Sequence, residues 1–125
     1  PEFPFREVAK TVSNAEFRPL LEQCVNAECA SRNESRRQIT AGDDHWKPAL
    51  VLREATLGID ALLAHDPKGL FDINEGQQYS MPAKLLHNML SRQEAVWKRT
   101  KLSAGIRDLV AKLAEKGHPM ESSRR

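Results

Sequence analysis

The chain has 125 residues, which is enough for one domain and too few for two ordinary ones. With 40% hydrophobic and 29% charged residues it can fold, so the composition excludes wholesale disorder. A net charge of +2 is too small to indicate nucleic-acid binding by itself. No stretch approaches the roughly 18 apolar residues of a membrane span, and the first residues lack the features of a signal peptide. We therefore expect an intracellular protein, cytoplasmic or nuclear, that does not contact membranes.

The first third of the chain is predicted to contain one helix. Residues 1–12 are expected to be extended, because they contain prolines that are tolerated in irregular strands but not inside helices. Ser13-Asn14-Ala15-Glu16 has the pattern of a capping box, which places a helix start near residue 14. Pro19 is too deep for a comfortable first turn, so regular helix is expected only from Leu20. Apolar residues then recur at helical spacing: Leu20, Leu21, Cys24, Val25 and Cys29.

Residues 31–44 are polar and have no apolar periodicity, which predicts a long exposed loop. No aromatic residue is interleaved with its three arginines, Arg32, Arg36 and Arg37, so a solvated loop is favoured over a contact with nucleic acid. Asp43-Asp44-His45 resembles an acid–base cluster, although adjacent aspartates before a helix more often favour the helix start.

A second helix is predicted from Pro48, a residue that suits the first helical position, to near His65. It should end there because Asp66-Pro67-Lys68-Gly69 has the composition of a turn. One stripe of this helix is apolar: Leu52, Ala55, Ile59, Leu62 and Leu63. Leu50, Val51 and Leu57 add apolar surface elsewhere, so we expect burial on more than one side.

The last third is predicted to hold two further helices after a loop over residues 70–79. Ser80 and Pro82 open a helix that runs to about Leu90, and the capping box Ser91-Arg92-Gln93-Glu94 allows a break and restart. A final amphipathic stripe is stopped by Gly117 and followed by Pro119; it consists of Leu102, Ile106, Leu109, Val110 and Leu113. The chain is thus expected to be a single domain over residues 1–117 with a frayed tail over 118–125.

Cysteine is the one conspicuous nucleophile in the sequence. Cys24 and Cys29 have no zinc-finger companions and the four histidines are scattered, so neither a metal site nor a cofactor is predicted. Without a secretory signal, a reduced pair is favoured over a disulfide. Nearby arginines could favour a thiolate at Cys29, but the residues alone favour a half-buried helix cysteine without chemistry. His87 lies on a leucine-rich face and is expected to be a core-edge histidine rather than a base.

The segment Trp46-Lys47-Pro48-Ala49-Leu50-Val51-Leu52, followed by Leu57-Gly58-Ile59-Asp60-Ala61-Leu62-Leu63, resembles ubiquitin-conjugating enzymes. In that family a Trp-x-Pro-Ala loop leads into a helix with this Leu/Ile stripe. Phe3-Pro4-Phe5 is similar to the family's Tyr-Pro-Phe, and Cys29 lies one residue beyond the expected position of the nucleophile. The resemblance covers roughly residues 3–100 and is specific only at 46–63.

The resemblance implies an α+β, helix-dominated fold: the C-terminal part of a ubiquitin-conjugating-enzyme-like fold with little strand, in a truncated or divergent member. An all-α helical domain is the alternative. The implied function is a carrier transferase that receives ubiquitin or a ubiquitin-like modifier from an activating enzyme as a thioester on Cys29. With a ubiquitin ligase, bound at Trp46, Lys47, Pro48 and Ala49, it would pass the modifier to lysine.

One departure from the family bears on activity. The family's His-Pro-Asn is Arg18-Pro19-Leu20 here, and loss of one oxyanion donor typically costs about 10²–10³ in rate. Leu20 thus favours the alternative function, a catalytically inactive relative or an unrelated helical protein–protein interaction module, whereas the order of Cys29 in the chain favours the enzyme.

Overall fold

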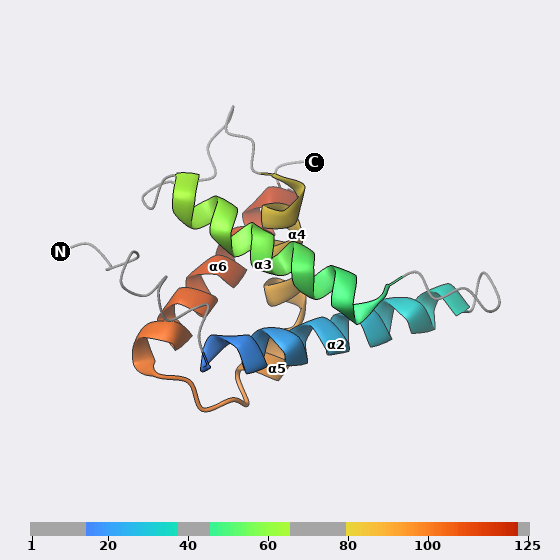
Figure 1. Cartoon of the computed structure of the whole chain (residues 1–125), viewed down its shortest axis with the longest axis horizontal. Helices are drawn as coiled ribbons and strands as arrows, with labels where there is room; N and C mark the ends of the chain where they lie inside the picture. Colours follow the sequence, from blue (N-terminus) through green and yellow to red (C-terminus); the bar gives the residue numbers. More distant parts are fainter. Residues whose placement is uncertain (1–14, 38–45, 66–79, 123–125) are drawn as a thin grey trace.

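The structure, a computed structural model, describes residues 15–37, 46–65 and 80–122. Figure 1 shows these residues as α2 (Phe17–Arg37), α3 (Pro48–His65), α4 (Met81–Arg92), α5 (Glu94–Trp97) and α6 (Ala104–Ser122), with no strand among them. The predicted α+β class is therefore wrong for the described chain, and the all-α alternative is confirmed. The extended segment expected at residues 1–12 lies outside the described residues. Within them, no helix is both long and apolar enough to cross a membrane.

The central helix of the fold is α4, against which both α3 and α6 pack (Figure 1). The approach of α3 to α4 is close at Gly58, where an added Cβ would lie 2.4 Å from the Pro82 carbonyl oxygen. Only glycine permits two backbones to come this near. The apolar stripe of α3, which the resemblance would place on a sheet, thus packs on helices. Ala55, Ile59 and Leu62 of this stripe are buried, together with the adjacent Val51. Leu50 and Leu57 are exposed instead, so the expected burial of α3 on more than one side is wrong.

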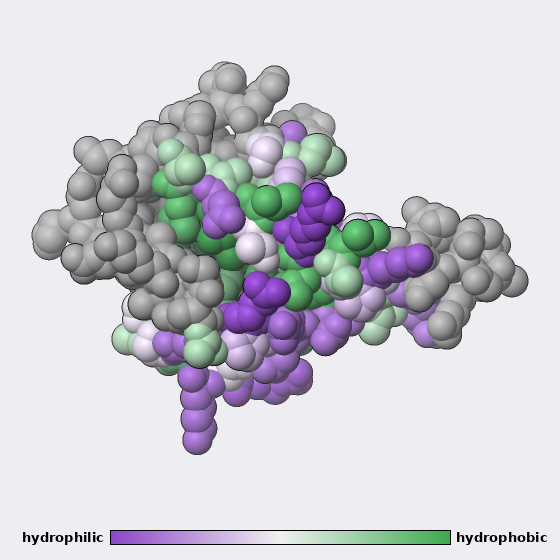
Figure 2. Space-filling model, in the orientation of Figure 1, coloured by the Kyte–Doolittle hydropathy of each residue, from purple (hydrophilic) through white to green (hydrophobic). Residues whose placement is uncertain are grey.

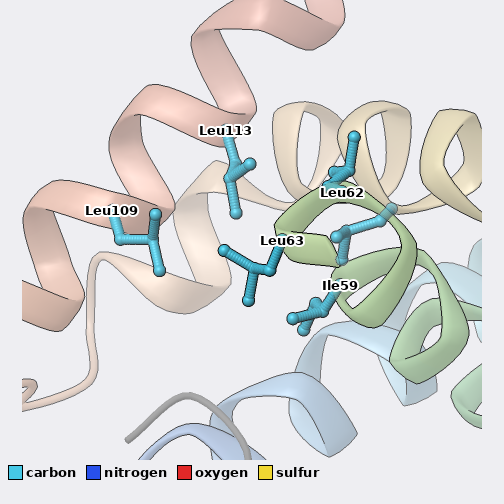
Figure 3. Close-up of a pocket in the computed structure, with 6 residues that line it drawn as sticks. Ile59, Leu62, Leu63, Leu109 and Leu113 are labelled. Carbon is cyan, nitrogen blue, oxygen red and sulfur yellow. The ribbon is translucent and has the colours of Figure 1, made fainter. Parts of the chain in front are cut away.

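Leucine side chains fill the space between α3 and α6. Figure 3 shows Leu63 pointing from α3 toward Leu109 and Leu113 of α6. The pocket that remains has a volume of about 10 Å³ and is lined by aliphatic residues alone, namely Ile59, Leu62, Leu63, Leu86, Leu109 and Leu113. A space of that size holds a single water at most, so this is a packing gap of the core and has no room for a ligand.

Helix α2 differs from the prediction at both ends. It begins at Phe17, which places Pro19 in the first turn, where a backbone N–H would have no intrahelical partner. The expectation of regular helix only from Leu20 is therefore wrong. The helix also continues to Arg37, so residues 31–37 are helical and not part of a loop. Figure 1 shows this polar end extending past the other helices, and residues 38–45 lie outside the described chain.

The predicted start and break of α4 are confirmed. The Ser80 hydroxyl accepts a hydrogen bond from the Ala83 N–H at 3.3 Å, as an N-cap should. The helix ends before Gln93, and the short helix α5 follows. The indole N–H of Trp97 in α5 donates to the Leu90 carbonyl at 2.9 Å, which fastens α5 onto α4.

The amphipathic stripe of α6 is also confirmed, since Ile106, Leu109, Val110 and Leu113 are buried. The helix nevertheless continues to Ser122, so the predicted stop at Gly117 is wrong. Glycine and proline disfavour a helix interior, but intrinsic propensity is a weak constraint. Residues 123–125 of the expected tail lie outside the described chain.

Candidate functional site

Two side chains of α2 hold the segment that leads into α3. The Asn33 side-chain oxygen accepts a hydrogen bond from the Trp46 backbone N–H, and the Asn33 amide donates to the Trp46 carbonyl, both at 3.0 Å. The Arg32 guanidinium lies 4.4 Å from the centroid of the Trp46 ring, within the range of a cation–π contact. Together these contacts fix the backbone and the ring of Trp46. They thereby hold the start of α3 against α2.

Trp46, Lys47, Pro48 and Ala49, predicted to bind a ligase, lie together at the N-terminus of α3. Trp46 is half-buried and serves as the anchor, whereas the other three residues are exposed. The Lys47 carbonyl accepts the first hydrogen bonds of the helix, from the N–H groups of Leu50 and Val51, both at 3.1 Å. The segment is therefore rigid and faces outward, and its binding to a ligase stays a prediction.

The α3 outer face, as we call it, continues from this segment along one side of the helix and consists of Lys47, Leu50, Arg53, Glu54, Leu57 and Asp60. Two of its members are large apolar residues with high exposed fractions, Leu50 at 56% and Leu57 at 43%. They lie seven residues apart, and therefore on the same side of the helix. In Figure 2 this side is toward the viewer, with green surface interrupted by purple charged side chains. The arrangement suits contact with another protein surface.

Glu28 is a buried carboxylate at the centre of a polar cluster, and it holds the Arg32 side chain in place by a hydrogen bond. Its carboxylate accepts hydrogen bonds from Arg32 Nε at 2.5 Å, Arg92 Nη2 at 2.8 Å and Gln93 Nε2 at 2.9 Å. The carboxyl is 1% exposed. Burial alone would raise the pKa of Glu28, but the hydrogen bonds from Arg92, Arg32 and Gln93 outweigh it and lower the pKa. The charged cluster thus joins α2 to the junction of α4 and α5.

Sequence reasoning missed Glu28 and Asn33. The spacing of Glu28 and Arg32, four residues apart in the same helix, is a local signal that could have indicated an ion pair. The contact of Glu28 with Arg92, however, spans 64 residues, and that of Asn33 with Trp46 spans 13. Because both cross the chain, no local pattern could have predicted them.

The two cysteines are both buried and are not joined by a disulfide. Burial, with a smaller contribution from the charge of Glu28, raises the pKa of Cys24 to about 12, so this thiol is neutral at pH 7. Cys29 is 2% exposed and belongs to the hydrophobic core. A thiol in such surroundings cannot reach a large protein substrate. The role of Cys29 as a nucleophile stays a prediction, and its position in the fold gives that role no support.

The other residues predicted to have a chemical role are either buried or outside the described residues. His87 is fully buried rather than at the core edge, and burial lowers its pKa to about 4, so it is neutral at pH 7. Asp43-Asp44-His45 lies outside the described residues. Among the residues that are described, no group of three His, Cys, Asp or Glu side chains could hold a metal ion.

Comparison with known proteins identifies no relative of this chain. No family model, no curated protein and no solved structure matches the chain. The resemblance to ubiquitin-conjugating enzymes therefore stays a prediction from residues 46–63, and any function must be argued from the surface and core of this chain.

Proposed function

We propose that the protein is a non-catalytic helical module that binds another protein through the α3 outer face. The observation that supports this most is the exposure of Leu50 and Leu57 on one side of a helix whose first residue is anchored through Trp46. A rigid helix that presents two leucines seven residues apart offers the anchors used in helix-mediated recognition.

Leu50 and Leu57 supply one part of the binding energy at this surface. Full burial of a leucine side chain contributes about 1.5–3 kcal/mol relative to full exposure. Leu50 and Leu57 are each about half-exposed, so a partner that covers both gains on the order of 2 kcal/mol from them. The anchored segment adds affinity indirectly, because Trp46 is already ordered and loses little conformational freedom on binding.

The chemistry of the described residues favours binding over catalysis. Carrier transfer needs an exposed cysteine that attacks a thioester, whereas both Cys24 and Cys29 are buried. His87, which could otherwise act as a base, is enclosed and neutral. No described side chain thus combines exposure with the perturbed pKa that marks a catalytic group.

A peptide-selection experiment tests the proposal. Helical peptides would be selected from a display library on the immobilised full chain, and the best binder labelled with fluorescein and measured by anisotropy. The double variant Leu50→Asp, Leu57→Asp should weaken binding at least about tenfold, because it places charge where the apolar anchors dock. Ala95→Asp, an exposed change in α5 away from this face, is the control and should leave binding unchanged. Equal affinity for the double variant would contradict the proposal.

A thioester assay tests the absence of carrier chemistry. The chain would be incubated with activating enzyme, ubiquitin and ATP and then analysed with and without thiol reductant. We expect no reducible adduct. An adduct that is lost in Cys29→Ser and kept in Cys24→Ser would overturn the non-catalytic proposal in favour of a carrier transferase.

A further inference from the structure

The charges on the α3 outer face have an order along the helix. The basic Lys47 lies at the N-terminal end of the face, the adjacent Arg53 and Glu54 lie in its middle, and the acidic Asp60 lies at its C-terminal end. Lys47, Arg53 and Asp60 are exposed, and among the described residues none of these three takes part in an ion pair. Within the described chain, the face thus carries a cation without an ion-pair partner at one end and a carboxylate without one at the other, with Leu50 and Leu57 between.

We propose that the partner of this face is a second copy of the same chain, bound with its α3 antiparallel. A twofold axis between residues 53 and 54 places Leu50 at the height of Leu57 of the second copy. The same alignment places Lys47 at the height of Asp60 of the second copy, and each contact occurs twice. Near the axis each copy contributes one Arg53 and one Glu54, so the charges there balance. This inference rests on the proposed function, since it names the partner of the same surface.

The helix ends supply a second reason for this alignment. Lys47 is the residue whose carbonyl begins α3, so its cation lies at the positive end of the helix dipole. The first turn of α3 contains no acidic residue that would offset it. An antiparallel copy brings the carboxylate of Asp60 to this end and the cation of Lys47 toward the opposite, negative end. In the pair, each charge therefore lies near a helix end of opposite sign, which is more favourable than its position in the single chain.

The size of the contact sets the expected strength. Residues 47–60 span about 20 Å of helix at 1.5 Å per residue. A contact between two such helix segments buries less surface area than a standard protein–protein interface of about 1,600 Å². Four half-exposed leucines and two exposed pairs of opposite charges contribute about 5 kcal/mol, which predicts a weak dimer with a dissociation constant on the order of 100 μM. Because the charge pairs are exposed, association should weaken as salt rises.

Charge exchange with sedimentation equilibrium tests the inference on the full chain. Lys47→Asp leaves both ends acidic and Asp60→Lys leaves both ends basic, so each variant alone should dimerise at least about tenfold more weakly than the unmodified chain. Mixing the two variants should restore association, because one copy is now acidic at both ends and the other basic. The double variant Lys47→Asp, Asp60→Lys should also regain the dimer.

Folding of the variants is not at issue, because aspartate is favourable at the position before a helix and lysine is a good helix former. The control is Lys101→Asp, which makes the same change in charge at an exposed residue outside α3 and should leave dimerisation unchanged. A chain that stays monomeric at several hundred micromolar, or a mixture of the single variants that does not associate, would overturn the inference.

The two proposals fail separately. If the chain is monomeric but the selected peptide still requires Leu50 and Leu57, the α3 outer face binds a different protein and only the second copy is excluded. If the Leu50→Asp, Leu57→Asp variant binds the peptide as tightly as the unmodified chain, the proposed function itself is contradicted, whatever the charge variants show.

Discussion

Glu28 shows how one buried carboxylate can hold together several helices of the fold. It belongs to α2, and its partners Arg92 and Gln93 mark the point where α4 gives way to α5. Arg32, which shares the carboxylate, also covers Trp46 and so extends the cluster to the start of α3. A charge buried with this many donors is costly to disturb, because its loss leaves the arginines without their acceptor.

We therefore expect Glu28→Gln to lower the free energy of unfolding by about 2 kcal/mol. The value is below that for a fully enclosed pair, because Arg32 and Arg92 are about one third exposed and can recover some hydration. Urea denaturation followed by circular dichroism gives the measurement. The matched control is Glu94→Gln, since Glu94 pairs with Lys98 at 3.1 Å with both side chains more than half exposed. The control should change stability by no more than about 0.5 kcal/mol, and equal effects would contradict the role of Glu28.

At the scale of the elements, local signals predicted both ends of α3 and the start of α4, but they missed both ends of α2 and the end of α6. Pro48 and Ser80 mark the beginnings of α3 and α4 because proline at a first position and a capping hydroxyl act within a few residues. The polar end of α2 could not be predicted in this way. Asn33 is in its place because of a bond to Trp46, a partner that becomes adjacent only after the chain has folded.

The contact between α3 and α4 leads to a prediction at Gly58. Alanine normally favours a helix over glycine by about 1 kcal/mol. Gly58→Ala should instead destabilise the protein by about 1–3 kcal/mol, because the new methyl group would meet the backbone of Pro82, which cannot move aside as a flexible side chain could. Thermal and urea unfolding would show the change.

Ala61→Gly, in the same helix and half-buried, measures the propensity effect alone and should cost about 1 kcal/mol. A stabilising Gly58→Ala would show that the close approach of α3 and α4 is not required for packing.

For the whole molecule, the helical segments were predictable and the fold class was not. The apolar stripes of α3 and α6 follow from helical spacing alone, and both are buried. The resemblance at residues 46–63 concerns one loop and one helix, and it supplied the sheet only by analogy. In the described chain α3 packs on α4 instead, because Gly58 admits the neighbouring backbone. In the segment predicted to bind a ligase, Lys47, Pro48 and Ala49 are exposed and Trp46 is half-buried, whereas Cys29 lies in the core. The functional roles of both stay predictions.

Acid should destabilise the whole protein in two stages. The pKa of His87 is about 4 in the folded chain against 6.5 ordinarily, so between these values the unfolded chain binds a proton that the folded chain does not. The free energy of unfolding is therefore highest above about pH 6.5 and falls by about 3 kcal/mol as the pH approaches 4. Glu28, with a lowered pKa, adds a further loss below about pH 4.5, because its carboxyl protonates first in the unfolded chain.

Urea unfolding at pH 7.5, 6.5, 5.5 and 4.5 would measure the first stage. In His87→Leu the decline between pH 6.5 and 4.5 should largely disappear, whereas in Glu28→Gln it should persist. A free energy of unfolding that is constant over this range in the unmodified chain would contradict the burial of a neutral histidine.

The positions of the two tryptophans have a practical consequence for spectroscopy. Trp97 is 2% exposed with its indole N–H bonded inside the core, whereas Trp46 is half-buried beneath Arg32 at the edge of the α3 outer face. They are the only tryptophans in the chain. Replacing either with phenylalanine leaves a single emitter, so intrinsic fluorescence can follow docking at the surface and melting of the interior as separate signals from one unlabelled protein.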